Sequence, residues 1–211
     1  MRRSIVVVLA MASFVCAAKT AEREPFAQTG VKTNPPPGYA SMCLEYPDEC
    51  LETATEPVKI ALTKGVWQDL QRINLQVNRQ IKPQSDLDHW GLDEWWTFGE
   101  DGYGDCEDYT LLKRRMLIAA GYPRQALLIT TGINPQAKEA ENRGHAVLTV
   151  VTDKGDYILD NMSDYIKLWS YTPYLYGKRQ TATNQNEWEI IQDPMREVPV
   201  ASGGDVTQNP K

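Results

Sequence analysis

The feature that most constrains the fold of this chain is the acidic run GDCEDY around Cys106, which opens a segment with helical spacing. Two more polar side chains follow in order: His145 begins an apolar segment, and Asp160 ends the next one. An activated thiolate needs these three groups, because a base must take the thiol proton and an acid must orient that base. A helix start also lowers a cysteine pKa through its dipole and free N–H groups. The set predicts a cysteine nucleophile on a helix that packs against strands.

Each of the three residues also has an ordinary interpretation. Cys106 alone could be a small buried residue, and Asp160 could simply begin a turn. His145 could be a satisfied core histidine, but a strand would hold it more rigidly than a loop holds His89, which we interpret as structural. A tight hairpin would place Asp160 opposite about Leu148, so strand twist or a bulge is needed to bring it to His145.

The N-terminus has the pattern of an export signal. Basic residues at Arg2 and Arg3 precede an apolar run over residues 5–15 and small residues up to Ala18. This predicts a signal peptide over residues 1–18 rather than a membrane span, which needs roughly 20 apolar residues. Cys16 leaves a lipoprotein as the alternative, but the residues before it make a poor lipidation site. We therefore expect a periplasmic or secreted protein with no transmembrane segment in the mature chain.

Charge and cysteine content narrow the class of protein. The formal net charge is −6, and an acidic exported protein is a poor candidate for binding nucleic acid through its phosphates. In an oxidising compartment the natural disulfide joins Cys43 to Cys50 and leaves Cys106 free. A Cys43–Cys106 pair is the alternative, and it would bury the nucleophile.

Hydrophobic spacing divides the chain into four parts. After the signal peptide, residues 19–56 form an irregular arm with a disulfide, because prolines at 35–37 disfavour helix and central strand. Residues 57–192 form the main domain, and residues 193–211 form a flexible tail.

Within the main domain the elements are expected in a helix-then-strand order. A short strand over 58–62 precedes a helix capped by Thr63, with one apolar face at positions 66, 70, 73, 77 and 81. A second helix over 106–120 has an apolar side at Tyr109, Leu112, Met116 and Ala119. Strands follow at 126–130, 145–152, 156–160, 174–179 and 188–191. This order predicts an α+β fold, with the nucleophile at a helix start packed on an antiparallel sheet.

Three motifs carry a resemblance to a known family. The sequences Gly-Asp-Cys-Glu-Asp-Tyr, Gly-His-Ala-Val-Leu and Tyr-Ile-Leu-Asp-Asn resemble the bacterial transglutaminase-like cysteine peptidase family, of the papain-like and transglutaminase-core superfamily. The resemblance covers roughly residues 57–192. It implies Cys106 as nucleophile, His145 as base and acid, and Asp160 as the residue that orients His145. The family includes LapG-type periplasmic proteases, which clip large surface adhesins.

The resemblance also implies a calcium site. LapG-type enzymes bind calcium through the acids that flank the cysteine, and Asp105 and Glu107 occupy those positions here. The ordinary alternative is that Asp105 caps the helix and that Glu107 complements its positive end. A cation beside these anions would offset their effect on the cysteine pKa. A membrane-anchored regulator that sequesters LapG-type enzymes is a further implied partner, beside the protein substrate.

Two departures leave the substrate open. Adhesin-cleaving members tend to have a Thr-Pro-x-Glu run before the cysteine motif, whereas this chain has Thr97-Phe98-Gly99-Glu100, and the Cys43/Cys50 arm is not typical of them. Trp95 and Trp96 could line the cleft, and we expect at least one of them to serve in packing.

The leading interpretation is an exported cysteine endopeptidase. The alternatives are an acyl-transfer enzyme, a transglutaminase or cell-wall amidase using the same thioester, and a non-enzymatic binding module.

Overall fold

The centre of the fold is a seven-stranded sheet with the order β1-β9-β8-β4-β5-β6-β7, in which all paired strands are antiparallel. The computed structural model describes residues 23–50, 56–138 and 143–192. The strands of this sheet are β1 (Gln28–Thr33), β4 (Leu127–Ile133), β5 (Gly144–Thr152), β6 (Gly155–Asp160), β7 (Ser163–Leu168), β8 (Leu175–Gln180) and β9 (Trp188–Gln192). The sheet and its helices confirm the α+β prediction.

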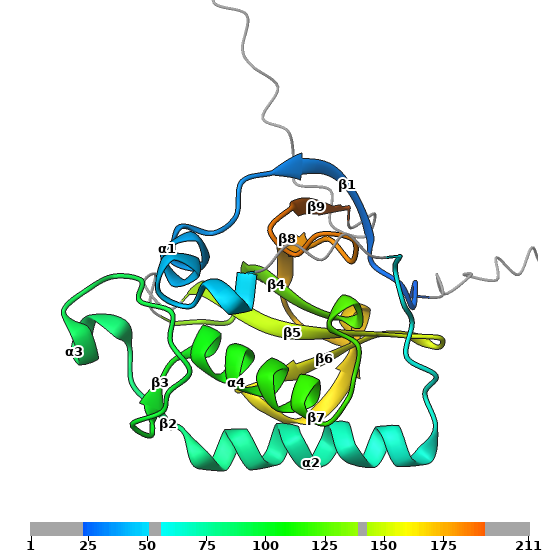
Figure 1. Ribbon diagram of the computed structural model, residues 1–211, viewed down its shortest axis with the longest axis horizontal. Coiled ribbons are helices and arrows are strands. Elements are labelled where there is room, and N and C mark those ends of the chain that lie inside the picture. The colour runs from blue at the N-terminus through cyan, green and yellow to red at the C-terminus, as the bar shows by residue number, and fades with distance from the viewer. Residues whose placement is uncertain (1–22, 51–55, 139–142, 193–211) are drawn as a thin grey trace, which may run out of the picture.

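Two long helices, α2 (Lys64–Gln80) and α4 (Cys106–Ala119), pack together beside this sheet, with α4 against β5 and α2 against β7 (Figure 1). The shorter elements are α1 (Pro37–Glu45), α3 (Asp86–Trp90), the 3₁₀ turns η1 (Pro47–Cys50), η2 (Arg124–Ala126) and η4 (Trp169–Tyr171), and the small parallel pair β2 (Lys82–Pro83) and β3 (Tyr103–Gly104). β3 leads directly into the start of α4, so the loop between α2 and α4 determines where Cys106 lies.

α2 forms as its sequence predicts. Leu70, Ile73 and Val77 recur at helical spacing and are fully or almost fully buried in one hydrophobic cluster. The Thr63 hydroxyl caps the helix by accepting a hydrogen bond from the Val66 N–H at 3.2 Å. The predicted strand over 58–62 is wrong: in this segment only Ile60 forms a β-bridge, to Thr152, since its neighbours have no partner strand.

α4 is buried on more than one side, which its predicted apolar face did not anticipate. Tyr109 is buried as expected, but Ala119 is exposed, and Leu112 and Met116 are only partly buried. Its buried residues are Glu107, Asp108, Tyr109, Thr110, Leu111, Lys113, Arg114 and Leu117. Because several of these are polar or charged, a hydrophobic pattern cannot reveal their burial.

The arm is regular, and the prediction of an irregular segment is wrong for its described part. β1 pairs with β9 at the edge of the main sheet. The prolines start α1 instead of preventing it, because Pro37 stands at the first helical turn, where a missing N–H costs nothing. Tyr39 and Met42 of α1 are buried in a cluster that includes Trp188 of β9.

The expected disulfide between Cys43 and Cys50 is present, and Cys106 is free. The disulfide joins α1 to η1, and the loop that it closes carries Glu49. The Glu49 carboxylate lies 3.1 Å from Arg115 and 3.5 Å from the buried Arg114. The cross-link therefore fixes both the shape of the arm and a charged contact with α4.

Within the residues that the structure describes, no helix is long and apolar enough to cross a membrane. The predicted signal peptide (1–18) and tail (193–211) lie outside the described residues.

Removing the disulfide should destabilise the protein modestly. We expect the Cys43→Ser/Cys50→Ser variant to lose about 2 kcal/mol of unfolding free energy, because a short loop contributes little chain entropy. Urea denaturation measures this loss. Wild-type protein treated with reductant is the matched control and should lose a similar amount. Equal stability of oxidised, reduced and variant protein would contradict a stabilising role.

Candidate active site

The start of α4 is fixed by its own acidic residues. Asp105 is the N-cap, and the Asp108 carboxylate accepts the Asp105 backbone N–H at 3.2 Å and the Thr97 N–H at 2.7 Å. A Cβ at position 104 would lie 2.3 Å from Asp108 Oδ2, so only glycine allows this carboxylate to fold over the backbone. Cys106 is thereby held at the first position of the helix, as the sequence predicts.

The hairpin of β5 and β6 brings His145 and Asp160 together. His145 Nε2 lies 3.0 Å from Asp160 Oδ1, and only 8% and 5% of the two residues is exposed. The register pairs Leu148 with Leu159, one residue away from the expected pairing. Asp160 therefore lies opposite Val147. Side chains two residues apart on a strand point to the same face, so His145 shares this face, and a diagonal contact joins the side chains of His145 and Asp160.

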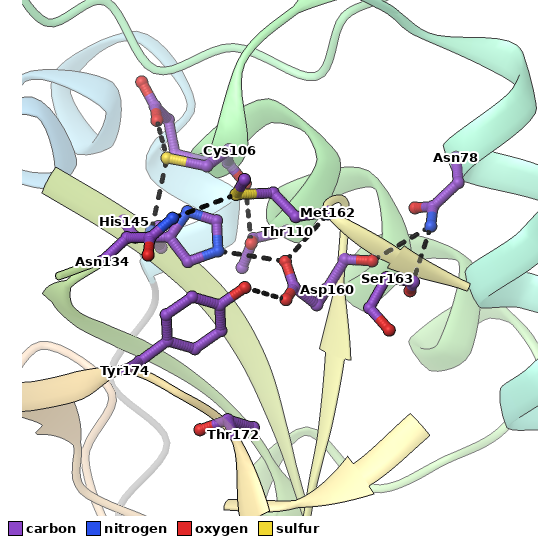
Figure 2. Close-up of polar contacts among 12 residues, drawn as sticks. Asn78, Cys106, Thr110, Asn134, His145, Asp160, Met162, Ser163, Thr172 and Tyr174 are labelled. Atoms are coloured by element: carbon purple, nitrogen blue, oxygen red, sulfur yellow. Dashed lines mark hydrogen bonds and ion pairs between the residues drawn. The ribbon is translucent and has the colours of Figure 1, made fainter. Parts of the chain in front are cut away.

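Asp160 is held by three donors. Besides His145, the Tyr174 hydroxyl donates a hydrogen bond to Oδ2, and the Met162 N–H donates to Oδ1 at 3.0 Å (Figure 2). Burial alone raises the pKa of Asp160, but these hydrogen bonds outweigh it, and the pKa lies below its usual value. The carboxylate is therefore ionised at neutral pH.

Tyr174 is a site residue that the sequence analysis missed. Its ring centroid lies 4.5 Å from that of the imidazole, and its hydroxyl donates to the carboxylate that orients the same imidazole. The available signal was weak, since a tyrosine just before the start of a strand is usually a packing residue.

The Cys106 thiol lies at the other side of the imidazole. Figure 2 shows His145 between Cys106 and Asp160. Sγ accepts a hydrogen bond from the Ala146 N–H at 3.3 Å and donates to Glu107 Oε2 at 3.2 Å. Because Nε2 is engaged by Asp160, Nδ1 is the imidazole nitrogen left for a different partner.

The surroundings of Cys106 favour the protonated thiol. Burial raises the pKa of Cys106 well above its ordinary value, and the charges of Glu107 and Asp105 raise it further. The sequence analysis expected the helix start to lower this pKa. That expectation is wrong, because burial and two adjacent carboxylates outweigh the helix dipole.

Four carboxylates gather at this end of α4. Ligand atoms of Asp105, Cys106 and Glu107 lie within 4.8 Å of one another, and so do those of Asp86, Asp105 and Asp108. Burial, with the neighbouring acids, raises the pKa of Asp86 to about 6, that of Asp108 to about 7, and that of Glu107 well above its ordinary value. Asp105 Oδ1 is buried without a hydrogen-bond partner among the described residues. The sequence analysis missed Asp86, which is distant in sequence from the cysteine motif.

The remaining aromatic candidates have structural roles. His89 lies 4.0 Å from the Trp90 ring and pairs with Asp101 at 2.8 Å, as expected for a structural histidine. Trp96 is buried against Tyr39 of the arm. This confirms the prediction that at least one of Trp95 and Trp96 serves in packing.

The chain is similar to solved structures of LapG from Legionella pneumophila. Calcium-bound Legionella pneumophila LapG is 27% identical with a TM-score of 0.47, and the match covers 56% of this chain and 66%, just under two thirds, of that chain. EGTA-treated Legionella pneumophila LapG is 26% identical with a TM-score of 0.49, over 62% of this chain and 73% of that one. None of the curated proteins matches the chain.

A family model covers most of the described residues. The model of the bacterial transglutaminase-like cysteine proteinases matches residues 29–196 and so includes the arm from β1 onward, which the resemblance over 57–192 left out. The chain belongs to the bacterial transglutaminase-like cysteine proteinases, a family of cysteine peptidases.

Proposed function

We propose that this chain is an exported cysteine endopeptidase that cleaves a protein substrate in the periplasm. Cys106 is the nucleophile, His145 is the general base and acid, and Asp160 orients His145. The observation that carries the proposal is the 3.0 Å contact from Asp160 Oδ1 to His145 Nε2, which leaves Nδ1 free of this carboxylate in an imidazole that lies between Asp160 and Cys106.

The reaction follows from these positions. His145 Nδ1 takes the Cys106 proton as Sγ attacks the peptide carbonyl, and the backbone N–H groups at the start of α4 stabilise the oxyanion. The C–N bond breaks, the leaving amine takes the proton from Nδ1, and a thioester remains. Water then gives a proton to Nδ1 and attacks the thioester; the C–S bond breaks, a carboxylic acid leaves, and Sγ takes the proton back from Nδ1, which restores the thiol. Asp160 stays ionised throughout and stabilises the imidazolium.

We propose that the four-acid cluster holds calcium. Asp105 and Glu107 would bind it, and Asp86 and Asp108 complete a set of hard oxygen donors of the kind that calcium prefers. The buried, unpartnered Asp105 Oδ1 supports this fit, because a buried carboxylate oxygen is costly without a partner. A bound cation would supply positive charge that offsets the carboxylates beside Cys106 and so favours the thiolate. Legionella pneumophila LapG, to which this chain is similar, has a calcium-bound structure, in agreement with this proposal.

The reactivity of Cys106 should depend on His145. We expect iodoacetamide to label Cys106 in wild type at neutral pH, and His145→Ala to slow labelling by roughly a hundredfold, because the general base is lost. Mass spectrometry of labelled peptides against time gives the rate. His89→Ala is the matched control, since His89 is structural, and should label like wild type. Equal rates in wild type and His145→Ala would remove the basis for the triad.

Hydrolysis should prevail over acyl transfer. Incubated with an unfolded protein and a fluorescent primary amine, the wild type should release new peptide termini and incorporate little amine, and Cys106→Ser should do neither. Gel analysis and amine fluorescence report the two outcomes separately. Strong amine incorporation without cleavage would assign the chain to acyl transfer instead.

Calcium should stabilise the protein more at pH 7.5 than at pH 5. The raised pKa values mean that the folded protein binds more protons than the unfolded chain up to about pH 6–7, so without metal its stability falls as pH rises through this range. Calcium binds the ionised acids, so it should stabilise the folded protein most above this pH range. Thermal melts with calcium or EGTA measure the effect, which Asp105→Asn should abolish and the exposed control Asp93→Asn should keep. A melting temperature that calcium leaves unchanged at pH 7.5 would contradict the site.

A further inference from the structure

Two asparagines interrupt the apolar face of α2, and the mechanism above uses neither of them. Asn74 and Asn78 are one helical turn apart, beside Leu70 and Val77; Asn74 is fully buried and Asn78 is partly buried. Asparagine is a weaker helix former than leucine, and a buried amide is costly unless it is hydrogen-bonded. Their place on this face therefore requires polar partners from another element.

The partners lie in the turn between β6 and β7. Asn74 Nδ2 donates to Ser163 O at 3.0 Å and lies 3.4 Å from Asp164 O. Asn78 Nδ2 donates to Asp160 O at 3.0 Å and lies 3.4 Å from Ser163 O and 3.2 Å from Asp164 Oδ1 (Figure 2 shows Asn78 beside this turn). Asn78 thus contacts the backbone of the residue that orients the imidazole.

The β-ladder alone does not determine how Asp160 is placed. The pairing of β6 with β7 shifts its register between Ile158 and Asp160, which then pairs with Ser163. Such irregularities often re-aim a side chain next to an active site. β7 is also the edge strand of the sheet, so it has a strand neighbour on one side only. The amides of α2 supply support that the ladder lacks.

The position of this turn is transmitted directly to the imidazole. The Met162 N–H, within the turn, donates to Asp160 Oδ1 at 3.0 Å, and the same oxygen lies 3.0 Å from His145 Nε2. A displacement of the turn would move both the backbone that carries Asp160 and the donor that aims its carboxylate. The hydrogen bonds of Asn78 act on both.

We infer that Asn78 is a positioning residue that acts on His145 through Asp160: its amide fixes the turn that ends β6 and thereby the direction of the orienting carboxylate. Asn74 holds the far side of the same turn. The inference rests on the proposed triad and makes α2 a support for it. A purely structural amide would stabilise the turn and leave the reactivity of Cys106 unchanged.

A double-mutant cycle tests whether Asn78 acts through Asp160. Asn78→Leu removes the amide at similar volume, and Gln76→Leu, the matched control, removes an exposed amide from the same helix. We expect Asn78→Leu to slow iodoacetamide alkylation of Cys106 by about fivefold, and Gln76→Leu to leave it unchanged. Asp160→Asn should slow it by roughly tenfold, and the double variant Asn78→Leu/Asp160→Asn should be no slower. Independent effects would multiply to about fiftyfold.

The titration of Asp160 gives a second readout. Burial raises the pKa of Asp160, but the hydrogen bonds that it accepts hold this pKa below its usual value. A looser turn weakens the hydrogen bond from Met162, so the carboxyl should titrate at higher pH in Asn78→Leu than in wild type. Carbon NMR of labelled aspartate follows this titration, and Asp160→Asn assigns the signal. Gln76→Leu should titrate like wild type.

Several results would overturn the inference without touching the triad. They are a wild-type alkylation rate in Asn78→Leu, even with lower stability in urea, a double variant slowed by the product of the two single effects, and an unchanged Asp160 titration. If Asn78→Leu does not fold by circular dichroism, Asn78→Ala takes its place in both measurements. Failure of the triad appears separately, as wild-type alkylation in both His145→Ala and Asp160→Asn.

Discussion

The burial of α4 is the constraint on which the rest of the structure depends. A helix that contacts the sheet, α2 and the arm has little solvent-facing surface for its charged residues, so each needs a partner from another element. Arg114 donates to Leu127 O and to Gln185 and pairs with Glu49 of the arm. Asp108 is satisfied by the segment before the helix. Segments distant in sequence are therefore fixed by the polar groups of one helix, and Cys106 stands at its start.

The sequence predicts the parts of this fold that follow hydrophobic periodicity. The apolar stripe of α2 and the hairpin around Gly155 place α2, β5 and β6 correctly, and the ordered cysteine, histidine and aspartate follow from them. β7 was missed because half of its residues are exposed and only Ile166 is buried, so no buried face marks it. Tyr174 and Asp86 reach the site only through tertiary packing. A one-dimensional pattern carries no information about such contacts.

The acids around Cys106 show why a nucleophile motif alone is a poor guide to reactivity. A helix start contributes a partial positive charge that favours the thiolate, whereas burial disfavours it and the charges of Glu107 and Asp105 disfavour it further. Burial and the carboxylates outweigh the helix dipole, and the resting thiol is protonated. Under the proposed mechanism, activation draws on two separate positive contributions: the imidazolium formed during reaction and the cation proposed for the acidic cluster.

The arm belongs to this same electrostatic arrangement, although it lies far from Cys106 in sequence. Gly38 of α1 lets Trp96 approach so closely that a Cβ there would lie 2.3 Å from the indole ring. The next residue, Thr97, donates both its N–H and its hydroxyl to Asp108, at 2.7 and 3.1 Å. A displacement of α1 would pass through Trp96 and Thr97 to the carboxylate that caps the helix of the nucleophile. The disulfide joins α1 to η1, and the arm that they form packs against the segment that leads to Cys106.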